Sequence, residues 1–194
     1  SLNHRNKKWN LYGNINPGKN TWYNDNTLIR STNYEGLRSE FNQSSKRNGS
    51  GVFTNGKIGA DYFLSSKTTL GAMLDANNWE GSGVNSGLTN IVEIKNDVRT
   101  ASSLIPSSKN DNANFNITAN MNLKHNFNDK GKELTVDLDY SGFNNTSLSD
   151  FENKFFDANN NITENQIQRN PTSTIIDIYA AKFDFSLPTK NKAK

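Results

Sequence analysis

Residues 115–127 alternate between apolar and polar side chains almost without a break. The odd positions are apolar or aromatic except for His125, and the even positions are Asn, Thr or Lys. A period of two predicts a β-strand with one apolar face and one polar face. At about 3.3 Å per residue this run would extend about 43 Å, enough to cross the hydrocarbon layer of a membrane when tilted by about 40°.

The same alternation recurs along the chain, so the sequence predicts a series of long, two-faced strands. Clear strand candidates cover residues 8–15, 58–64, 70–76, 134–140 and 175–187, with weaker candidates at 22–32, 34–41 and 91–103. The total is eight or nine strands. No amphipathic helical pattern of ten or more residues interrupts the series, which argues against a parallel α/β sheet.

The predicted connections alternate between short and long. Short turns follow Leu64, Phe127 and Leu187, the last at residues 188–192. Long polar loops are predicted at residues 80–90 and 144–171, and further turns or loops at 16–20, 46–51 and 107–112. Outer-membrane barrels combine short periplasmic turns with longer outer loops. We therefore predict an all-β fold, an antiparallel transmembrane β-barrel segment with short periplasmic turns and long extracellular loops.

Residues 5–14, 59–70 and 123–127 resemble strand and hairpin phrases of a known family. This family is the outer-membrane β-barrel portion of TonB-dependent receptor-like proteins of the Bacteroidetes type. The resemblance implies a barrel of about 22 strands, a plug domain and energy coupling through TonB. No plug domain or TonB-binding segment is evident here. We expect residues 1–194 to be a single β-barrel domain or a fragment of a larger barrel.

The composition mainly serves to exclude other classes of protein. Of the 194 residues only 32% are hydrophobic, and roughly one residue in six is Asn. Disorder and a barrel with a polar interior both fit such a composition, but the 10% aromatic content and the regular alternation favour the barrel. The net charge of +3 includes no clustered basic run, so no nucleic-acid partner is expected. The chain has no Cys, hence no disulfide framework.

Candidate chemistry is sparse, and we expect no enzyme, no cofactor and no metal. His4 and His125 lie far apart in the sequence. Asp137 and Asp139 are spaced as the polar face of a strand rather than as an acid–base pair. Residues 157–168 begin like a calcium loop, but Ile stands at its glycine position and Gln at its final glutamate position.

The function expected from this pattern is that of an outer-membrane barrel, part of a TonB-dependent receptor-like transporter that takes up a solute. Its expected partners are the lipid bilayer, a TonB system and plug domain, and an unknown solute. Ala119, Met121, Leu138 and Phe183 are expected to face lipid. Candidates for an aromatic girdle are Trp9, Trp22, Tyr23 and Trp79, and candidates for the lumen are Asn120, Lys124, Asp137, Asp139, Lys182 and Asp184.

Two alternatives remain open at this point. One is a soluble or surface-exposed β-sandwich that binds carbohydrate or protein, whose apolar faces would meet each other. The other is a lipocalin-like barrel with apolar side chains inside. Alternation cannot separate inside from outside, although strand length and the unequal connections favour the membrane.

Overall fold

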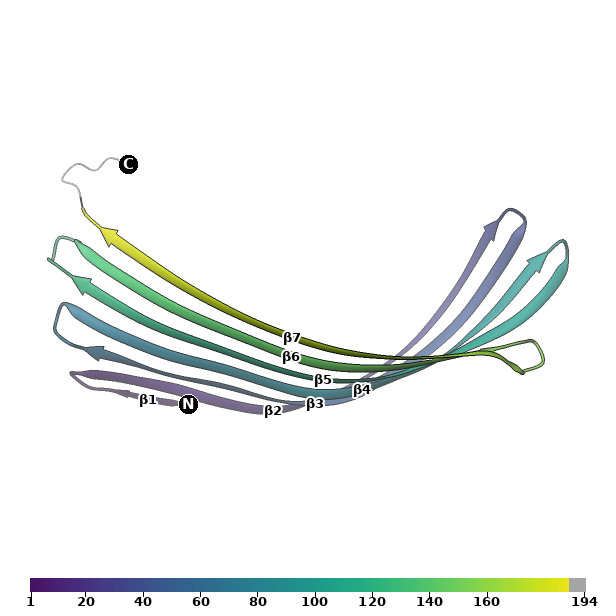
Figure 1. Ribbon diagram of the computed structural model, residues 1–194, viewed down its shortest axis with the longest axis horizontal. Coiled ribbons are helices and arrows are strands. Elements are labelled where there is room, and N and C mark those ends of the chain that lie inside the picture. Colours follow the sequence, from purple (N-terminus) through teal and green to yellow (C-terminus); the bar gives the residue numbers. More distant parts are fainter. Residues whose placement is uncertain (189–194) are drawn as a thin grey trace.

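The computed structural model describes residues 1–188 as one antiparallel sheet whose strands follow chain order (Figure 1). The sheet is a single curved layer, and its long strands run side by side along the long axis. The predicted all-β antiparallel fold is confirmed, and the described residues contain no helix. The strands are β1 (Leu2–Arg5), β2 (Trp9–Tyr34), β3 (Leu37–Phe63), β4 (Thr68–Lys95), β5 (Val98–Asn126), β6 (Glu133–Phe156) and β7 (Ile162–Ser186).

The long polar loops expected from the sequence are strands. Residues 80–90 continue β4, and residues 144–156 and 162–171 extend β6 and β7. The turns or loops expected at 16–20, 46–51 and 107–112 also lie inside strands, so the prediction of eight or nine strands was wrong. These segments are rich in Gly, Asn and Ser, yet each finds an aligned neighbour that completes its backbone hydrogen bonds.

Three tight turns close the hairpins at one end of the sheet. Glu35 and Gly36 both have positive φ, at 48° and 77°, as do Asn96 and Asp97 at 49° and 61°. Positive φ at both central residues is the type I′ pattern, whose twist matches that of two paired strands. The third turn, at residues 157–161, is organised by Asp157, whose Oδ1 accepts hydrogen bonds from the backbone N–H groups of Asn159 and Asn161 at 2.9 and 2.8 Å.

The opposite end carries turns at residues 6–8, 64–67 and 127–132. Asn6 Oδ1 accepts hydrogen bonds from the N–H groups of Lys8 and Trp9, both at 2.8 Å. Asn128 Oδ1 does the same for Lys130 and Lys132. The short reversals predicted after Leu64 and Phe127 are therefore confirmed. The turn predicted at residues 188–192 lies almost wholly outside the described residues.

The sheet is open and has no core of its own. Across residues 1–188 no hydrophobic side chain is buried, and β7 pairs only with β6. β1 covers only residues 10–13 of β2, which leaves most of that strand's outer edge without a partner in the described part of the chain. No helix long and apolar enough to cross a membrane occurs in residues 1–188. Stability therefore comes from ladder hydrogen bonds and cross-strand side-chain pairs.

Candidate functional site

Strand register divides the side chains between two faces, because residues directly opposite each other project to the same side. We call one the Met121 face, after the row that crosses β2 to β7. It consists of Leu11, Ala60, Ala72, Met121, Leu138 and Ala181. We call the other the Asn122 face, after the neighbouring row. It consists of Asn10, Asp61, Gly71, Asn122, Asp137 and Lys182.

A row of asparagines divides the sheet along its length into two halves. Asn16, Asn55, Asn77 and Asn116 lie opposite one another on β2 to β5, on the Asn122 face. The proximal half runs from this row to the turns at residues 6–8, 64–67 and 127–132. The distal half runs from this row to the turns at residues 35–36, 96–97 and 157–161.

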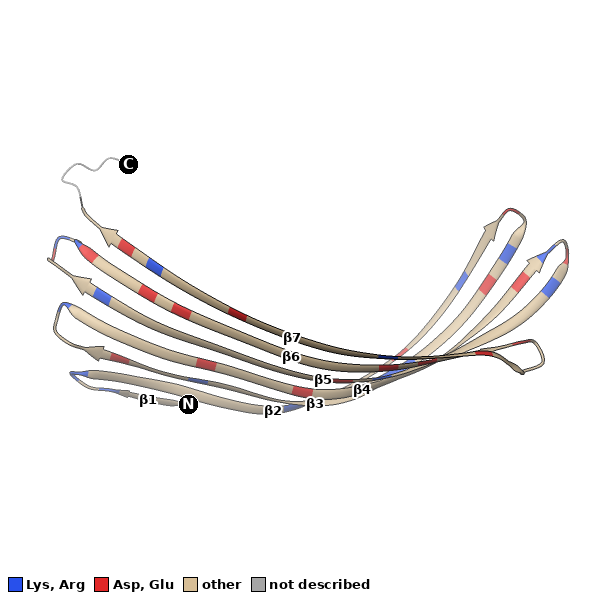
Figure 2. Ribbon diagram, in the orientation of Figure 1, with Lys and Arg blue, Asp and Glu red and all other residues tan. Residues whose placement is uncertain are grey.

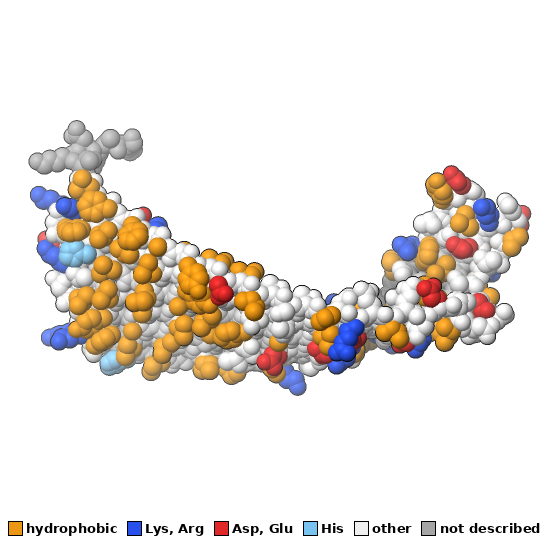
Figure 3. Space-filling model, in the orientation of Figure 1, with side chains coloured by type: hydrophobic (Ala, Val, Ile, Leu, Met, Phe, Trp, Pro, Cys, Tyr) orange, Lys and Arg blue, Asp and Glu red, His pale blue; other side chains and the backbone are white. Residues whose placement is uncertain are grey.

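In the proximal half the Met121 face is apolar and exposed. Ile58 is 63% exposed, Met121 62% and Phe183 70%. Figure 3 shows hydrophobic side chains gathered over the end of the sheet that carries the proximal turns, and we call this region the apolar field. Within the described strands of this half, Asp177 is the only Asp, Glu, Lys or Arg on the Met121 face. The hydroxyl of Tyr140 donates a hydrogen bond of 2.7 Å to its carboxylate.

Aromatic pairs lie near both borders of this apolar field. Trp9 and Tyr62 have ring centroids 4.3 Å apart near the proximal turns. Phe127 and Phe185 meet edge to face there, at 6.1 Å. Tyr140 and Tyr179 form a tilted pair at 5.1 Å, closer to the asparagine row. The arrangement places polar ring atoms near the limits of an apolar band, as in interfacial girdles.

The Asn122 face of the proximal half carries the charges. Its ionised side chains are Arg5, Lys57, Asp61, Asp75, Lys124, Glu133, Asp137, Asp139, Lys182 and Asp184. Lys124 and Glu133 lie 3.0 Å apart, and Lys57 and Asp75 lie 3.5 Å apart. Every member of both pairs is at least a third exposed, so each pair contributes only about 0–1 kcal/mol. The face is therefore wet and charged rather than a packed interior.

The residues predicted for the lumen share one face. Asn120 donates a hydrogen bond of 2.7 Å to Asp139, and Lys182 pairs with Asp184 at 2.6 Å. Register places all six candidates on the Asn122 face of the proximal half, namely Asn120, Lys124, Asp137, Asp139, Lys182 and Asp184. Whether this face lines a lumen remains a prediction.

The four girdle candidates do not share a face. Trp9 and Tyr23 lie on the Met121 face, whereas Trp22 and Trp79 lie on the Asn122 face. Trp9 lies beside the apolar field, but Tyr23 lies in the distal half. One sheet cannot present both faces to lipid, so these four residues do not form one girdle. The expectation used closeness to predicted strand ends, and the true strands end elsewhere.

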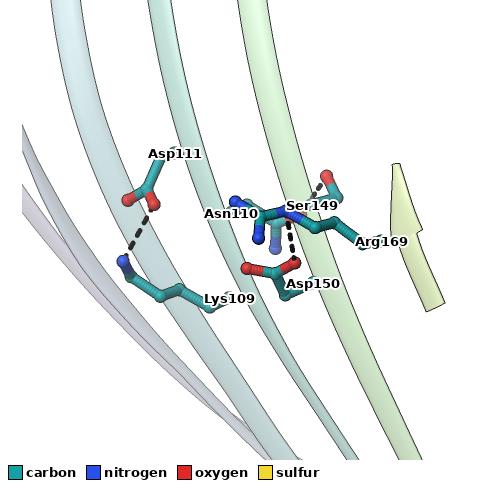
Figure 4. Close-up of polar contacts among 6 residues, drawn as sticks. All are labelled: Lys109, Asn110, Asp111, Ser149, Asp150 and Arg169. Atoms are coloured by element: carbon teal, nitrogen blue, oxygen red, sulfur yellow. Dashed lines mark hydrogen bonds and ion pairs between the residues drawn. The ribbon is translucent and has the colours of Figure 1, made fainter. Parts of the chain in front are cut away.

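In the distal half, register places most of the charges on the Met121 face instead. Figure 2 shows that charged residues occur along the strands of both halves. Lys109 and Asp111 pair at 2.9 Å on the Met121 face, and Arg169 and Asp150 pair there at 3.5 Å (Figure 4). Hydrogen bonding to Asp111 raises the pKa of Lys109. Ser149 donates a hydrogen bond of 2.7 Å to Asn110 on the opposite face. The Met121 face is thus apolar in one half and charged in the other.

The distal Asn122 face carries a group of residues that sequence reasoning missed. It combines Trp22, Phe53 and Trp79 with many asparagines and glycines. Trp22 was expected to begin a weak strand candidate, and Phe53 and Trp79 lie beside the loops expected at residues 46–51 and 80–90, so their shared face could not be assigned. The sequence does contain a signal, because glycines and aromatic residues are spaced at even intervals from asparagines. Even spacing indicates a shared face only where the segment is a β-strand.

The polar groups singled out in the sequence as candidate chemistry lie apart in the described residues. No group of three or more His, Asp or Glu side chains in residues 1–188 is placed to hold a metal ion. His125 Nδ1 lies 2.8 Å from Thr68 Oγ1 on the neighbouring strand, in a hydrogen bond of the Met121 face. Asp157, the first residue of the partial calcium motif, accepts hydrogen bonds from its own turn instead.

Comparisons with known proteins give one family match and two weak structural similarities. No curated protein matches the chain. A solved siderophore receptor, PiuA from Acinetobacter baumannii, aligns at 8% identity over 98% of this chain and 45% of its own, with a TM-score of 0.20. The membrane pore complex of pneumolysin aligns at 7% identity over 90% of this chain and 31% of its own, with a TM-score of 0.16. The chain spans less than half of either protein, and neither similarity carries an argument about function.

Residues 125–194, which include β6 and β7, match the sequence model of the Outer membrane protein beta-barrel family.

Proposed function

We propose that this sheet is part of the wall of an outer-membrane β-barrel that takes up a solute across the bacterial outer membrane. The Met121 face contacts lipid, and the Asn122 face lines the lumen or contacts a plug domain. The match of residues 125–194 to an outer-membrane barrel family supports the location. Resemblance to TonB-dependent receptor-like proteins supports coupling to a TonB system.

The division of charge between the two faces of the proximal half is the observation that carries the proposal. One face holds ten ionised side chains named above, and the other holds Asp177 alone. A charge facing lipid at the bilayer midplane costs about 2–4 kcal/mol, whereas a charge facing the lumen remains hydrated. A sheet in water has no reason to clear one face of charge and leave that face exposed.

The depth of the apolar band agrees with a membrane. Along β5 the apolar alternation covers residues 115–126, which is about 40 Å at 3.3 Å per residue. A strand tilt of about 40° reduces this to about 30 Å across the bilayer, close to the height of the apolar band of outer-membrane barrels. The aromatic pairs near both borders would then lie close to the two interfaces.

The distal half extends beyond the bilayer in this arrangement. Strands of 24 to 29 residues are about 80–95 Å long, far more than the membrane requires. The proximal turns lie at the border of the apolar band, whereas the distal strands reach far beyond it. Outer-membrane barrels extend on the outer side and have short connections on the periplasmic side, so the proximal turns belong in the periplasm and the distal half projects outside the cell. Charged side chains on the distal Met121 face then meet water instead of lipid.

Single-cysteine labelling tests this orientation, and the natural absence of cysteine gives a clean background. Met121→Cys and Asn122→Cys are reconstituted in lipid vesicles and exposed to a water-soluble maleimide. We expect rapid labelling at position 122 and little at 121, with equal labelling after denaturation. Leu138→Cys and Asp137→Cys, on neighbouring β6, provide a second matched pair. Equal labelling within both pairs, or a folded monomer in buffer without detergent, would contradict the proposal and favour the soluble β-sandwich.

A further inference from the structure

The distal Asn122 face differs from every other part of the sheet in being polar but almost uncharged. Between the row of Asn16 and the row of Asn26, Arg47 is its only ionised side chain among the described residues. Its side-chain amides are those of Asn16, Asn20, Asn24, Asn26, Asn55, Asn77, Asn85, Asn110, Asn112, Asn114, Asn116, Asn145, Asn153, Gln166, Gln168 and Asn170. We call this the amide surface.

Two tryptophans lie flat within the amide surface because glycines make room for their rings. The Trp79 ring crosses Gly51 and Gly81, where an added Cβ would come within 2.9 and 2.6 Å of it. The Trp22 ring crosses Gly49, where an added Cβ would overlap the ring, and continues toward Gly83. One side of each ring is therefore held against the backbone, and both tryptophans remain half-buried. The rings form flat apolar platforms among the amides.

A hollow of about 810 Å³ adjoins the Trp22 platform. Asn24 and Asn26 line it from β2, Arg47 from β3, Asn85 from β4, and Asn110 from β5. Asparagine offers two donors and an oxygen acceptor, so these side chains present closely spaced donors and acceptors beside an aromatic ring. The oxygens of Asn116 and Asn145, elsewhere on this surface, are buried without a hydrogen-bond partner in the described structure. Those two oxygens are enclosed, so a ligand would pair with the more accessible amides, such as those of the exposed Asn24 and Asn26.

This chemistry selects among ligand classes. An anionic ligand such as a phosphate would require a group of cations, and Arg47 stands alone. A cationic ligand would require carboxylates, which lie on the proximal half of this face instead. A sugar ring has hydroxyls that pair with amides and an apolar side that packs on an aromatic ring. We infer that the amide surface binds a neutral oligosaccharide, which rests on the proposed function because the solute must reach the Asn122 face from outside.

Isothermal titration calorimetry with neutral oligosaccharides tests the inference. The full chain is folded in micelles of lauryldimethylamine oxide, whose headgroup carries no sugar that would compete. The probes are linear malto-, cello-, manno- and xylo-oligosaccharides. We expect at least one probe to bind with an affinity that does not change with ionic strength, since neutral ligands are not screened.

Tryptophan variants locate the bound sugar. Trp22→Ala and Trp79→Ala should each weaken binding by about tenfold or more, the usual consequence of removing an aromatic anchor. Trp9→Ala is the matched control, because Trp9 lies on the Met121 face. Trp22→Phe should retain part of the affinity.

Three results would overturn the inference: no probe binds the folded chain, Trp9→Ala weakens binding as much as Trp22→Ala, or binding falls steeply with salt. Its failure is separable from failure of the proposed function. If the labelling pattern at positions 121 and 122 holds but no probe binds, only the ligand assignment is wrong. If the labelling pattern fails, the membrane orientation is wrong.

Discussion

At the scale of single residues, Met121 and Asn122 are neighbours in the chain but belong to different surroundings. Met121 lies in the apolar field with a 62% exposed side chain, while Asn122 donates a hydrogen bond of 3.0 Å to Asn120 on the charged face. A pair of adjacent positions therefore compares the two faces at one depth. This makes the pair the most direct probe of what each face contacts.

Arginine at these two positions should have unequal effects on stability. Met121→Arg is expected to lower the free energy of unfolding in lipid vesicles by about 2–4 kcal/mol, because its charge faces lipid. Asn122→Arg should cost much less, because the face already carries charged side chains. Denaturant titration followed by tryptophan fluorescence measures both. Equal losses at the two positions would mean that neither face meets lipid.

Alternation in the sequence was sufficient to place the proximal residues but not the distal ones. Asn120, Lys124 and Asp137 were assigned to one face because unbroken alternation connects them to apolar neighbours. Trp22 could not be assigned to a face, because a turn was expected at residues 16–20. The alternation of faces along residues 8–15 could not be continued across that turn. The amide surface was missed for the same reason.

At the scale of elements, the hairpins of the distal half explain why the predicted loops are absent. Where both faces of a strand are polar, period-two alternation disappears, and the sequence looks like a solvated coil. The pairing of neighbouring strands in the distal half is then fixed by the geometry of the turns and by the register already set in the proximal half. The pairs at residues 35–36 and 96–97 contain the Gly, Asn and Asp that type I′ turns prefer, although they lack the Asn-Gly or Asp-Gly order that would have signalled a hairpin.

The turn between β6 and β7 should depend on pH. Hydrogen bonds from Asn161 and Asn159 hold the pKa of Asp157 below its usual value of 3.8. A lowered pKa means that the ionised carboxylate stabilises the turn above pH 3.8, and that this contribution is lost as the pH falls through the lowered value. The protection of the Asn159 and Asn161 amides from hydrogen exchange, relative to their intrinsic rates, should be high at neutral pH and fall only below that range.

Asp157→Asn serves as the control for this behaviour. Its amide oxygen can accept the two backbone hydrogen bonds that Asp157 Oδ1 accepts, but it does not ionise, so exchange should show no step at acid pH beyond the intrinsic trend. Acceleration at the same pH in both proteins would show that Asp157 is not the responsible group.

At the scale of the whole molecule, the open edges are the main feature that alternation could not predict. The total number of strands and the manner of closure depend on pairing between distant segments, which leaves no local signal in a sequence. In lipid an unpaired backbone N–H or C=O group costs several kcal/mol, so the edge at β7 requires a partner strand. Its exposed Tyr179, Phe183 and Phe185 lie along that edge.

We expect the 194-residue chain, on its own in detergent micelles, to associate edge to edge. Light scattering coupled to size-exclusion chromatography should detect dimers or larger species. Pro substitutions at β7 positions whose N–H groups point away from β6 should reduce this association, since Pro removes the donor. A stable monomer with β7 bonded to β2 would instead mean that the sheet closes by itself.

The two-residue turns at the distal end have a consequence for how such a protein can diversify. A hairpin that ends in a tight turn can lose or gain one opposed pair of residues at its tip without altering the register or face of any residue below. Each such step changes the height of the wall by about 3.3 Å and adds or removes one rung. Deleting a single residue lower in one strand would instead send every residue beyond it to the wrong face. The distal ends of the hairpins can therefore lengthen or shorten by one opposed residue pair at a time while the proximal half stays unchanged.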